Sequence, residues 1–362
     1  MHGRPAFAVF AGALALLAAC SSASTGGGEA PAPTLWTFEE FAWYRWMNTV
    51  AMNSTVGPII ARQTVLFGGT YGYAVIGQET RTSRLALLDA ATGQTRWRIE
   101  QAGTWGPIAL HGGVVAAAID PASGTRRWRA RSTTDAVTAG DTVLFIDGQT
   151  LRAVAADTGA GRWALDLPAA LAYPQSLQGD HLYVLGASSL GSVNIETRSL
   201  EWVAPLGRAP TAGIAAADGT LYVTTQSASG SYVFHAFAPA TQKDRWSRAL
   251  DSSSPVAPIV MGTLVATAAN SSAESLVALS RSTGVVAWSA RAGSVPVQPV
   301  LNGNVLYVAG QGPNRIYAFQ AGTGTVLWSG RLWGWPMGMA LTEDGTLLVG
   351  ADNLTLYAYR TR

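Results

Sequence analysis

The side chains that could do chemistry in this sequence are four histidines, one cysteine and scattered carboxylates. The histidines are His2, His111, His181 and His235, and their spacing is not that of a zinc or iron site. The sequence also has no Gly-x-Ser-x-Gly elbow, no P-loop and no dinucleotide fingerprint. We therefore predict no catalytic, cofactor-binding or metal-binding residues, and we interpret the histidines as solvated residues of turns or strands.

The carboxylates indicate structural roles. Most of them lie close to turn glycines, where an aspartate can hydrogen-bond to its own turn. Examples are Asp89, Asp141, Asp218 and Asp344. We expect these residues to shape turns rather than to act as acids or bases.

The single cysteine suggests a different chemistry. A short basic start is followed by an apolar run from Ala6 to Ala19, which is too short to span a bilayer as a permanent helix. The run ends in Leu17-Ala18-Ala19-Cys20, which resembles the lipobox of bacterial lipoproteins, where the cysteine is acylated and becomes the new N-terminus. The resemblance implies a signal peptide at residues 1–19 and a lipid anchor, including palmitate, on Cys20. A signal without lipidation and with a chance cysteine is the alternative.

The residues after Cys20 favour a tether. Positions 20–34 are rich in serine, glycine and proline, a composition typical of a flexible linker that becomes semi-rigid. Ser21 stands where lipoproteins retained in the inner membrane carry an aspartate. The resemblance therefore implies an outer-membrane anchor facing the periplasm, or the outer face of the plasma membrane in a host without an outer membrane.

The composition limits the classes of fold and of binding partner that remain possible. The chain has 362 residues, of which 48% are hydrophobic and 13% charged, with 40 glycines. These values exclude a disordered chain and favour many short strands and turns. The net charge of +2 gives no support to nucleic-acid binding.

A recurring tryptophan predicts a repeated architecture. It returns at intervals of roughly 40 residues, which indicates one supersecondary unit copied many times. The series is Trp46, Trp97, Trp128, Trp163, Trp202, Trp246, Trp288 and Trp328. Several members follow a Thr-Gly or Ser-Gly turn, whose glycine would let a neighbouring indole lie against the backbone. We expect these tryptophans to pack between blades.

The stretch from Pro299 to Trp328 shows one unit clearly, because three apolar runs alternate with Asn-Gly, Gly-Pro and Thr-Gly turns. Three segments, which end at Trp97, Trp288 and Trp328, closely resemble the tryptophan-docking motif of the PQQ-type propeller family. The resemblance covers residues 35–362. It implies an all-β propeller of four-stranded antiparallel blades stacked face to face.

The ends of the chain suggest eight blades. Residues 337–359 supply three strands without a closing tryptophan strand, whereas residues 34–48 contain Trp46 without preceding strands. We predict that the N-terminal strand closes the last blade. The alternative is a seven-bladed ring with a helix over residues 36–52, since Thr37-Phe38-Glu39-Glu40 resembles a capping box. The copy that ends at Trp128 is short, and we expect one of its strands to be missing or distorted.

The resemblance also suggests a function. PQQ-dependent dehydrogenases use a longer chain and adjacent cysteines, whereas this chain has only Cys20, so we predict no bound cofactor and no enzyme activity. A lipid-anchored propeller resembles the BamB family, which implies a non-enzymatic scaffold that docks to the POTRA domains of the barrel insertase and assists outer-membrane protein insertion. The arginine and paired aspartates of that family's partner-binding loops have no match here. The alternatives are a PQQ-repeat propeller that binds another envelope protein or a polysaccharide, an envelope sensor module, and a PQQ-dependent oxidoreductase.

Five tryptophans lie outside the series, namely Trp36, Trp43, Trp105, Trp333 and Trp335. Trp333 and Trp335 fall in a predicted connection between blades, where an exposed aromatic pair would suit a protein partner. Local packing is the alternative for this pair.

Overall fold

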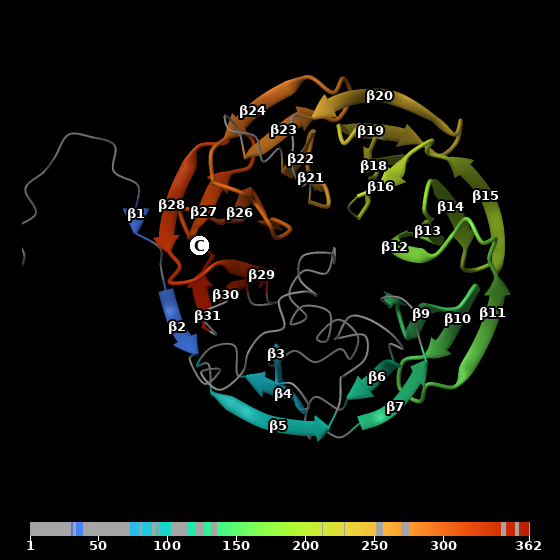
Figure 1. Cartoon of the computed structure of the whole chain (residues 1–362), viewed down its shortest axis with the longest axis horizontal. Coiled ribbons are helices and arrows are strands. Elements are labelled where there is room, and N and C mark those ends of the chain that lie inside the picture. Colours follow the sequence, from blue (N-terminus) through green and yellow to red (C-terminus); the bar gives the residue numbers. More distant parts are fainter. Residues whose placement is uncertain are drawn as a thin grey trace, which may run out of the picture.

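The computed structural model describes residues 30–31, 34–38, 73–79, 82–88, 92, 94–102, 115–119, 126–131, 136–211, 213–227, 229–250, 256–268, 275–341, 345–351 and 355–361. All regular elements in these ranges are β-strands. They form eight sheets that lie around a common centre (Figure 1). The prediction of an all-β propeller with antiparallel sheets is confirmed. Eight blades stays a prediction, because two sheets are described only in part.

The sheets follow one another in chain order. The first two contain β3 (Tyr73–Glu79), β4 (Thr82–Leu88) and β5 (Thr95–Ala102), then β6 (Val115–Ile119) and β7 (Arg126–Arg131). The third contains β8 (Val137–Ala139), β9 (Thr142–Asp147), β10 (Thr150–Ala155) and β11 (Gly161–Asp166). The fourth contains β12 (Tyr173–Gln178), β13 (His181–Leu185), β14 (Ser189–Asn194) and β15 (Ser199–Pro205).

The remaining four sheets continue the order. The fifth contains β16 (Ala209–Pro210), β17 (Ala215–Ala217), β18 (Thr220–Gln226), β19 (Tyr232–Ala238) and β20 (Lys243–Leu250). The sixth contains β21 (Ile259–Met261), β22 (Leu264–Ala268), β23 (Leu276–Ser280) and β24 (Val286–Ala290). The seventh contains β25 (Val300–Asn302), β26 (Val305–Gly310), β27 (Arg315–Gln320) and β28 (Val326–Arg331), with β1 (Ala30–Pro31) added in parallel to β28. The eighth contains β29 (Pro336–Leu341), β30 (Thr346–Ala351), β31 (Leu356–Arg360) and β2 (Thr34–Phe38).

The eighth sheet joins the two ends of the ring. β2 pairs antiparallel with β31, with Thr34 opposite Tyr359 and Phe38 opposite Leu356. β2 takes the outermost place in this sheet, as β5, β7, β11, β15, β20 and β24 do in the others, whereas β28 of the seventh sheet has β1 outside it (Figure 1). Residues 36–38 are therefore in a strand, and the helix of the seven-bladed alternative does not begin there.

The tryptophan repeat has one backbone register. Trp328 of β28 lies opposite Ala318 of β27, and Trp288 of β24 lies opposite Ala278 of β23. In both pairs of strands, the register shifts between this alanine and the residue that follows it. Trp36 has the same place in β2, opposite Ala358 and beside a register shift. Trp46, predicted as the first member of the series, lies outside the described residues.

The hydrophobic core lies between neighbouring sheets. In one cluster, Trp288 of β24 packs with Leu306 and Phe319 of the seventh sheet. In the next, Trp328 of β28 packs with Leu347 and Tyr359 of the eighth. Each sheet thus buries a face that it could not bury alone, which is the physical reason for stacking the units.

Turn glycines seat the indoles of Trp128, Trp246 and Trp288. The Trp288 indole Nε1–H donates a hydrogen bond of 3.0 Å to the Ala321 carbonyl oxygen of the next sheet. Trp246 donates to Arg281 in the same way at 2.9 Å, and Trp128 donates to Ala156 at 2.8 Å. A Cβ built on Gly324 would lie 2.6 Å from the Trp288 ring. A side chain there would displace the indole.

Arg281 adds a polar link between the fifth and sixth sheets. Its carbonyl oxygen accepts the Trp246 indole bond, and its guanidinium donates to the Asp218 carboxylate at 2.8 Å and to the Tyr222 hydroxyl at 3.1 Å. Asp218 itself has a φ of 46° and precedes Gly219 at 64°, so this pair supplies the positive dihedrals predicted for the hairpin turn.

We predict that Gly324→Ala destabilises the protein far more than Gly303→Ala. Both glycines have positive φ, so alanine costs about 1 kcal/mol at either position. The Cβ meets nothing within 4 Å at Gly303, whereas at Gly324 it meets Trp288, and overpacking adds about 1–3 kcal/mol. Urea unfolding of both variants measures the difference. Equal losses would contradict the docking of the indole on this turn.

Candidate functional site

Two histidines of the described chain contact carboxylates, and the His181 side chain is 46% exposed whereas that of His235 is 14% exposed. His181 of β13 lies 2.8 Å from the Glu201 carboxylate of β15, and the Ser192 hydroxyl of β14 donates to the same oxygen at 2.7 Å. Burial alone would raise the pKa of Glu201, but the hydrogen bonds from Ser192 and His181 outweigh it and hold that pKa below its usual value. This cluster ties three strands of one sheet together.

The neighbouring sheet has a similar relay with a different order of residues. The Thr225 hydroxyl lies 2.9 Å from His235 Nε2, and His235 Nδ1 lies 2.8 Å from the Asp244 carboxylate. A hydroxyl, an imidazole and a carboxylate in this order could activate a nucleophile. Thr225, however, is fully buried, so no substrate can reach its hydroxyl. The relay therefore links strands β18, β19 and β20.

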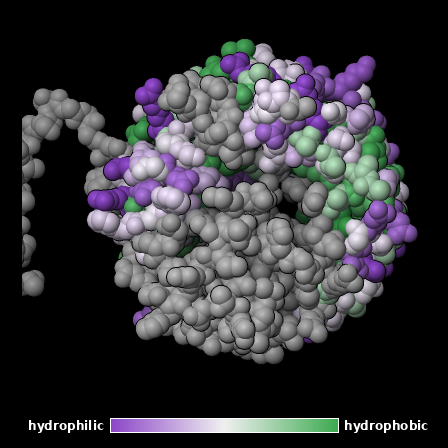
Figure 2. Space-filling view, viewed as in Figure 1, coloured by the Kyte–Doolittle hydropathy of each residue, from purple (hydrophilic) through white to green (hydrophobic). Residues whose placement is uncertain are grey.

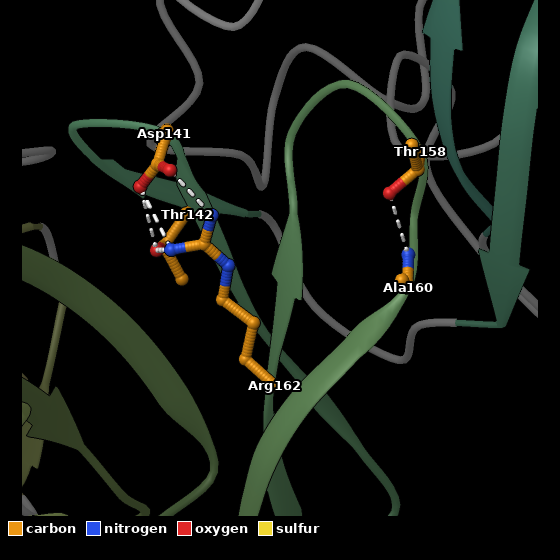
Figure 3. Close-up of polar contacts among 5 residues, drawn as sticks. All are labelled: Asp141, Thr142, Thr158, Ala160 and Arg162. Atoms are coloured by element: carbon orange, nitrogen blue, oxygen red, sulfur yellow. Dashed lines mark hydrogen bonds and ion pairs between the residues drawn. The ribbon is translucent and has the colours of Figure 1, made fainter.

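In the third sheet, an arginine donates hydrogen bonds to the carboxylate of a turn aspartate. Arg162 of β11 donates to Asp141 at 2.8 Å and to the Thr142 hydroxyl at 2.8 Å (Figure 3). The hydrogen bond from Arg162 is the main cause of a lowered pKa at Asp141. Within the described ranges, the carboxylates of Asp141 and Asp218 thus both bind arginines, in line with the structural roles predicted for them.

The connection between β11 and β12 presents a fixed apolar surface. Leu167 and Leu171 are buried, whereas Pro168, Ala169 and Ala170 between them are exposed. The Leu171 amide donates to the Pro168 carbonyl oxygen at 2.9 Å. In the view of Figure 2, hydrophobic residues gather on the right, in the sector of β12–β15.

Close packing holds this connection in place. The Ser189 hydroxyl donates to the Ala170 carbonyl oxygen. A Cβ on Gly186 would lie 1.4 Å from the same oxygen, and one on Gly191 would lie 2.5 Å from Leu171. The exposed alanines are therefore held by backbone contacts that tolerate no side chain, and a surface ordered in advance loses little entropy on binding.

Trp333 and Trp335 lie in the connection between β28 and β29, and both are exposed, at 69% and 45%. The Arg331 guanidinium stacks over the Trp333 ring at 4.0 Å. The structure thus leaves this predicted pair open to solvent. Cys20, His111, Trp43 and Trp105 lie outside the described residues.

The described residues contain no group of three or more histidine, cysteine, aspartate or glutamate side chains that could hold a metal ion. In the same ranges, no helix is long and apolar enough to cross a membrane.

These features define a class of protein. A ring of antiparallel sheets, with indoles seated on the turn glycines of the next sheet, is a β-propeller of the PQQ-repeat type. The family model described as outer membrane protein assembly factor BamB matches residues 111–205, 186–312 and 291–362. The chain therefore belongs to the BamB family.

Solved structures show the same fold. BamB from Moraxella catarrhalis is 16% identical and has a TM-score of 0.62, with 92% of this chain and 98% of that chain covered. The computationally designed Ika8 protein is 11% identical and has a TM-score of 0.57, with 84% and 99% covered. No curated protein sequence matches the chain.

We predict that Glu201→Gln removes an acid-sensitive part of the stability. The folded pKa of Glu201 is lowered, so its contribution is present above the unfolded value of about 4.3 and is lost as the pH falls through the folded value. Urea unfolding at neutral and acidic pH should show the wild-type advantage over Glu201→Gln shrinking toward acid. Glu196→Gln, an exposed change in the same sheet, is the control. If the free energies of unfolding of Glu201→Gln and the wild type fell by the same amount between neutral and acidic pH, the prediction would be wrong.

Proposed function

We propose that this protein is a non-enzymatic scaffold of the cell envelope that docks to the POTRA domains of the barrel insertase and assists outer-membrane protein insertion. The observation that carries the proposal is membership of the BamB family across residues 111–362. The buried Thr225 relay adds support, because this triad-like arrangement is closed to substrates.

The proposed location follows from the N-terminal sequence. Cys20 would carry the lipid, residues 20–34 would act as the tether, and Ser21 favours the outer membrane facing the periplasm. β1 begins at Ala30 within this stretch and pairs with β28. The tether would therefore meet the ring at its outer edge.

The proposed docking surface is the connection between β11 and β12. Its exposed residues Pro168, Ala169 and Ala170 are small and apolar, and the contacts of Ser189 and Gly186 fix their backbone. The next connection, from β15 to β16, leaves the same end of the neighbouring sheet and exposes Arg208. Small apolar residues on one connection and an arginine on the next suit a protein surface that combines an apolar centre with a polar rim.

In-cell photocrosslinking tests this proposal. A photoreactive amino acid at Ala169 of the full chain should give an adduct with a POTRA-bearing protein. The same probe at Thr241, an exposed residue of the turn between β19 and β20 at the opposite end of the fifth sheet, should not. Mass spectrometry identifies the partner, and the mass of the Cys20 peptide separately tests lipidation.

Two outcomes would overturn the assignment. Adducts from Ala169 with an unrelated envelope protein would indicate a propeller with a different partner. A bound chromophore or dye reduction after adding PQQ and Ca²⁺ to the purified protein would indicate an oxidoreductase.

A further inference from the structure

Four exposed aliphatic side chains lie on three consecutive sheets, where the N-terminal segment joins the ring. They are Leu35, Val285, Val326 and Leu327, with exposed fractions between 37% and 61%. Each lies at or next to the start of a strand that carries a tryptophan of the repeat register, namely β2, β24 or β28. These three strands are neighbours along the left side of the ring in Figure 1. We name the four residues the apolar band.

The apolar band departs from a pattern that the other sheets follow. In the first five sheets the residue directly before the tryptophan of the repeat register is charged, in the series Arg96, Arg127, Arg162, Glu201 and Arg245. In the last three sheets the same position holds Ala287, Leu327 and Leu35. Residues at this position are exposed in the third to the eighth sheet. The outer wall of the ring therefore changes from charged to apolar in one sector.

Charges of both signs flank the apolar band without forming part of it. The three strands carry one charged residue, Arg331, at the far end of β28. Arg360 is exposed at the end of β31, one residue past the partner of Thr34. Three acidic residues belong to the same end of the seventh and eighth sheets by their place in the sequence and lie outside the described residues, namely Glu29, Glu343 and Asp344. The band itself therefore suits an apolar occupant rather than one of a particular charge.

The N-terminal segment reaches the ring from the same end as the apolar band. β1 is parallel to β28, with Ala30 opposite Trp328. The residues before Ala30 therefore approach from the start of β28, where Leu327 lies. The ten residues from Cys20 to Glu29 extend to at most about 36 Å. A lipid on Cys20 would thus keep a bilayer within this distance of the end of the sheet that carries the band.

The side chains of the apolar band suit lipid better than a protein partner. Binding energy at protein interfaces comes mainly from tryptophan, tyrosine and arginine, whereas leucine and valine are under-represented among the anchoring residues. The band consists of leucine and valine alone, which transfer favourably into the apolar part of a bilayer.

We infer that the apolar band is the contact of the ring with the surface of the bilayer that holds Cys20. The inference rests on the proposed lipid anchor for the identity of that surface. A short tether holds the ring at an effective concentration on the order of millimolar, so a weak contact is enough to be occupied. The contact does not require anionic headgroups, because the band carries no charge.

This contact would turn the proposed docking connection away from the membrane. The connection between β11 and β12 lies on the opposite side of the ring from β28 and β2 (Figure 1). It also follows the end of β11, whereas the apolar band lies at the start of the corresponding strands. A bilayer on the band therefore leaves the connection open to a protein partner.

A vesicle assay with a coupled chain tests the inference whether or not the cell acylates Cys20. The chain from Cys20 onward contains every described residue and a single thiol, which couples it to a maleimide phospholipid in phosphatidylcholine vesicles. A fluorescent amino acid at Thr325, exposed beside Val326, should be quenched by brominated acyl chains. The same probe at Thr241, exposed at the corresponding turn of the fifth sheet, should not be quenched. Phosphatidylglycerol vesicles and added salt should change the quenching little.

Substitutions separate the apolar band from the exposed tryptophans at the other end of the seventh sheet. Val326→Thr/Leu327→Thr keeps residue types that favour strands and should shift the balance from contacting to free rings by roughly tenfold. Trp333→Thr is the matched control, because it removes a larger exposed side chain beyond the far end of β28. Its quenching at Thr325 should equal that of the wild type.

Two results would overturn the inference. One is equal quenching at Thr325 and Thr241, or quenching at Thr325 that the double variant leaves unchanged, with circular dichroism showing that the proteins are folded. The other is a photocrosslinker at Thr325 that yields adducts with a protein in cells and none with lipid. Absence of a lipid on the Cys20 peptide from cells would count against the proposed anchor alone, because the coupling replaces it in this assay.

Discussion

The fold depends on an indole that leaves its own sheet and binds the backbone of the next. The Trp288 ring covers Gly324 and its Nε1–H reaches the Ala321 carbonyl oxygen, so one side chain supplies both the apolar contact and the hydrogen bond between two sheets. Repetition of this contact makes the ring a chain of similar interfaces. Because each interface is local, the surface connections can vary without disturbing the ring.

Much of this architecture could be predicted from the sequence, because the docking contact needs residues that are easy to recognise. A tryptophan after a glycine turn, repeated at nearly constant spacing, indicates the register of the outer strand before any coordinates are known. Two turns depart from the pattern. Arg198 and Gln242 replace the glycine and adopt positive φ values of 58° and 53°. These two turns thus keep the left-handed backbone conformation without a glycine, which the glycine motif alone does not predict.

Other features could not be predicted, because they join residues that no motif connects. Glu201 and Asp244 bind histidines on other strands, and only the register of the sheets brings them together. Trp36 shares the register of the repeat, whereas Trp46 was predicted as the first member; no glycine turn precedes either tryptophan, so the motif could not distinguish them. The exposure of Trp333 depends on Tyr357 holding the backbone from the neighbouring sheet, a contact set by the closed ring.

The pairing of β2 with β31 has a consequence for how the protein is made. Thr34 and Tyr359 are neighbours in the sheet although they lie at opposite ends of the chain, so this seam forms only after nearly the whole polypeptide has been delivered. Until then the first strand has no partner, and the last three strands present an open edge that could pair with other chains. A protein of this design is therefore most exposed to mispairing while it folds, because that interval ends only when β31 is available to pair with β2.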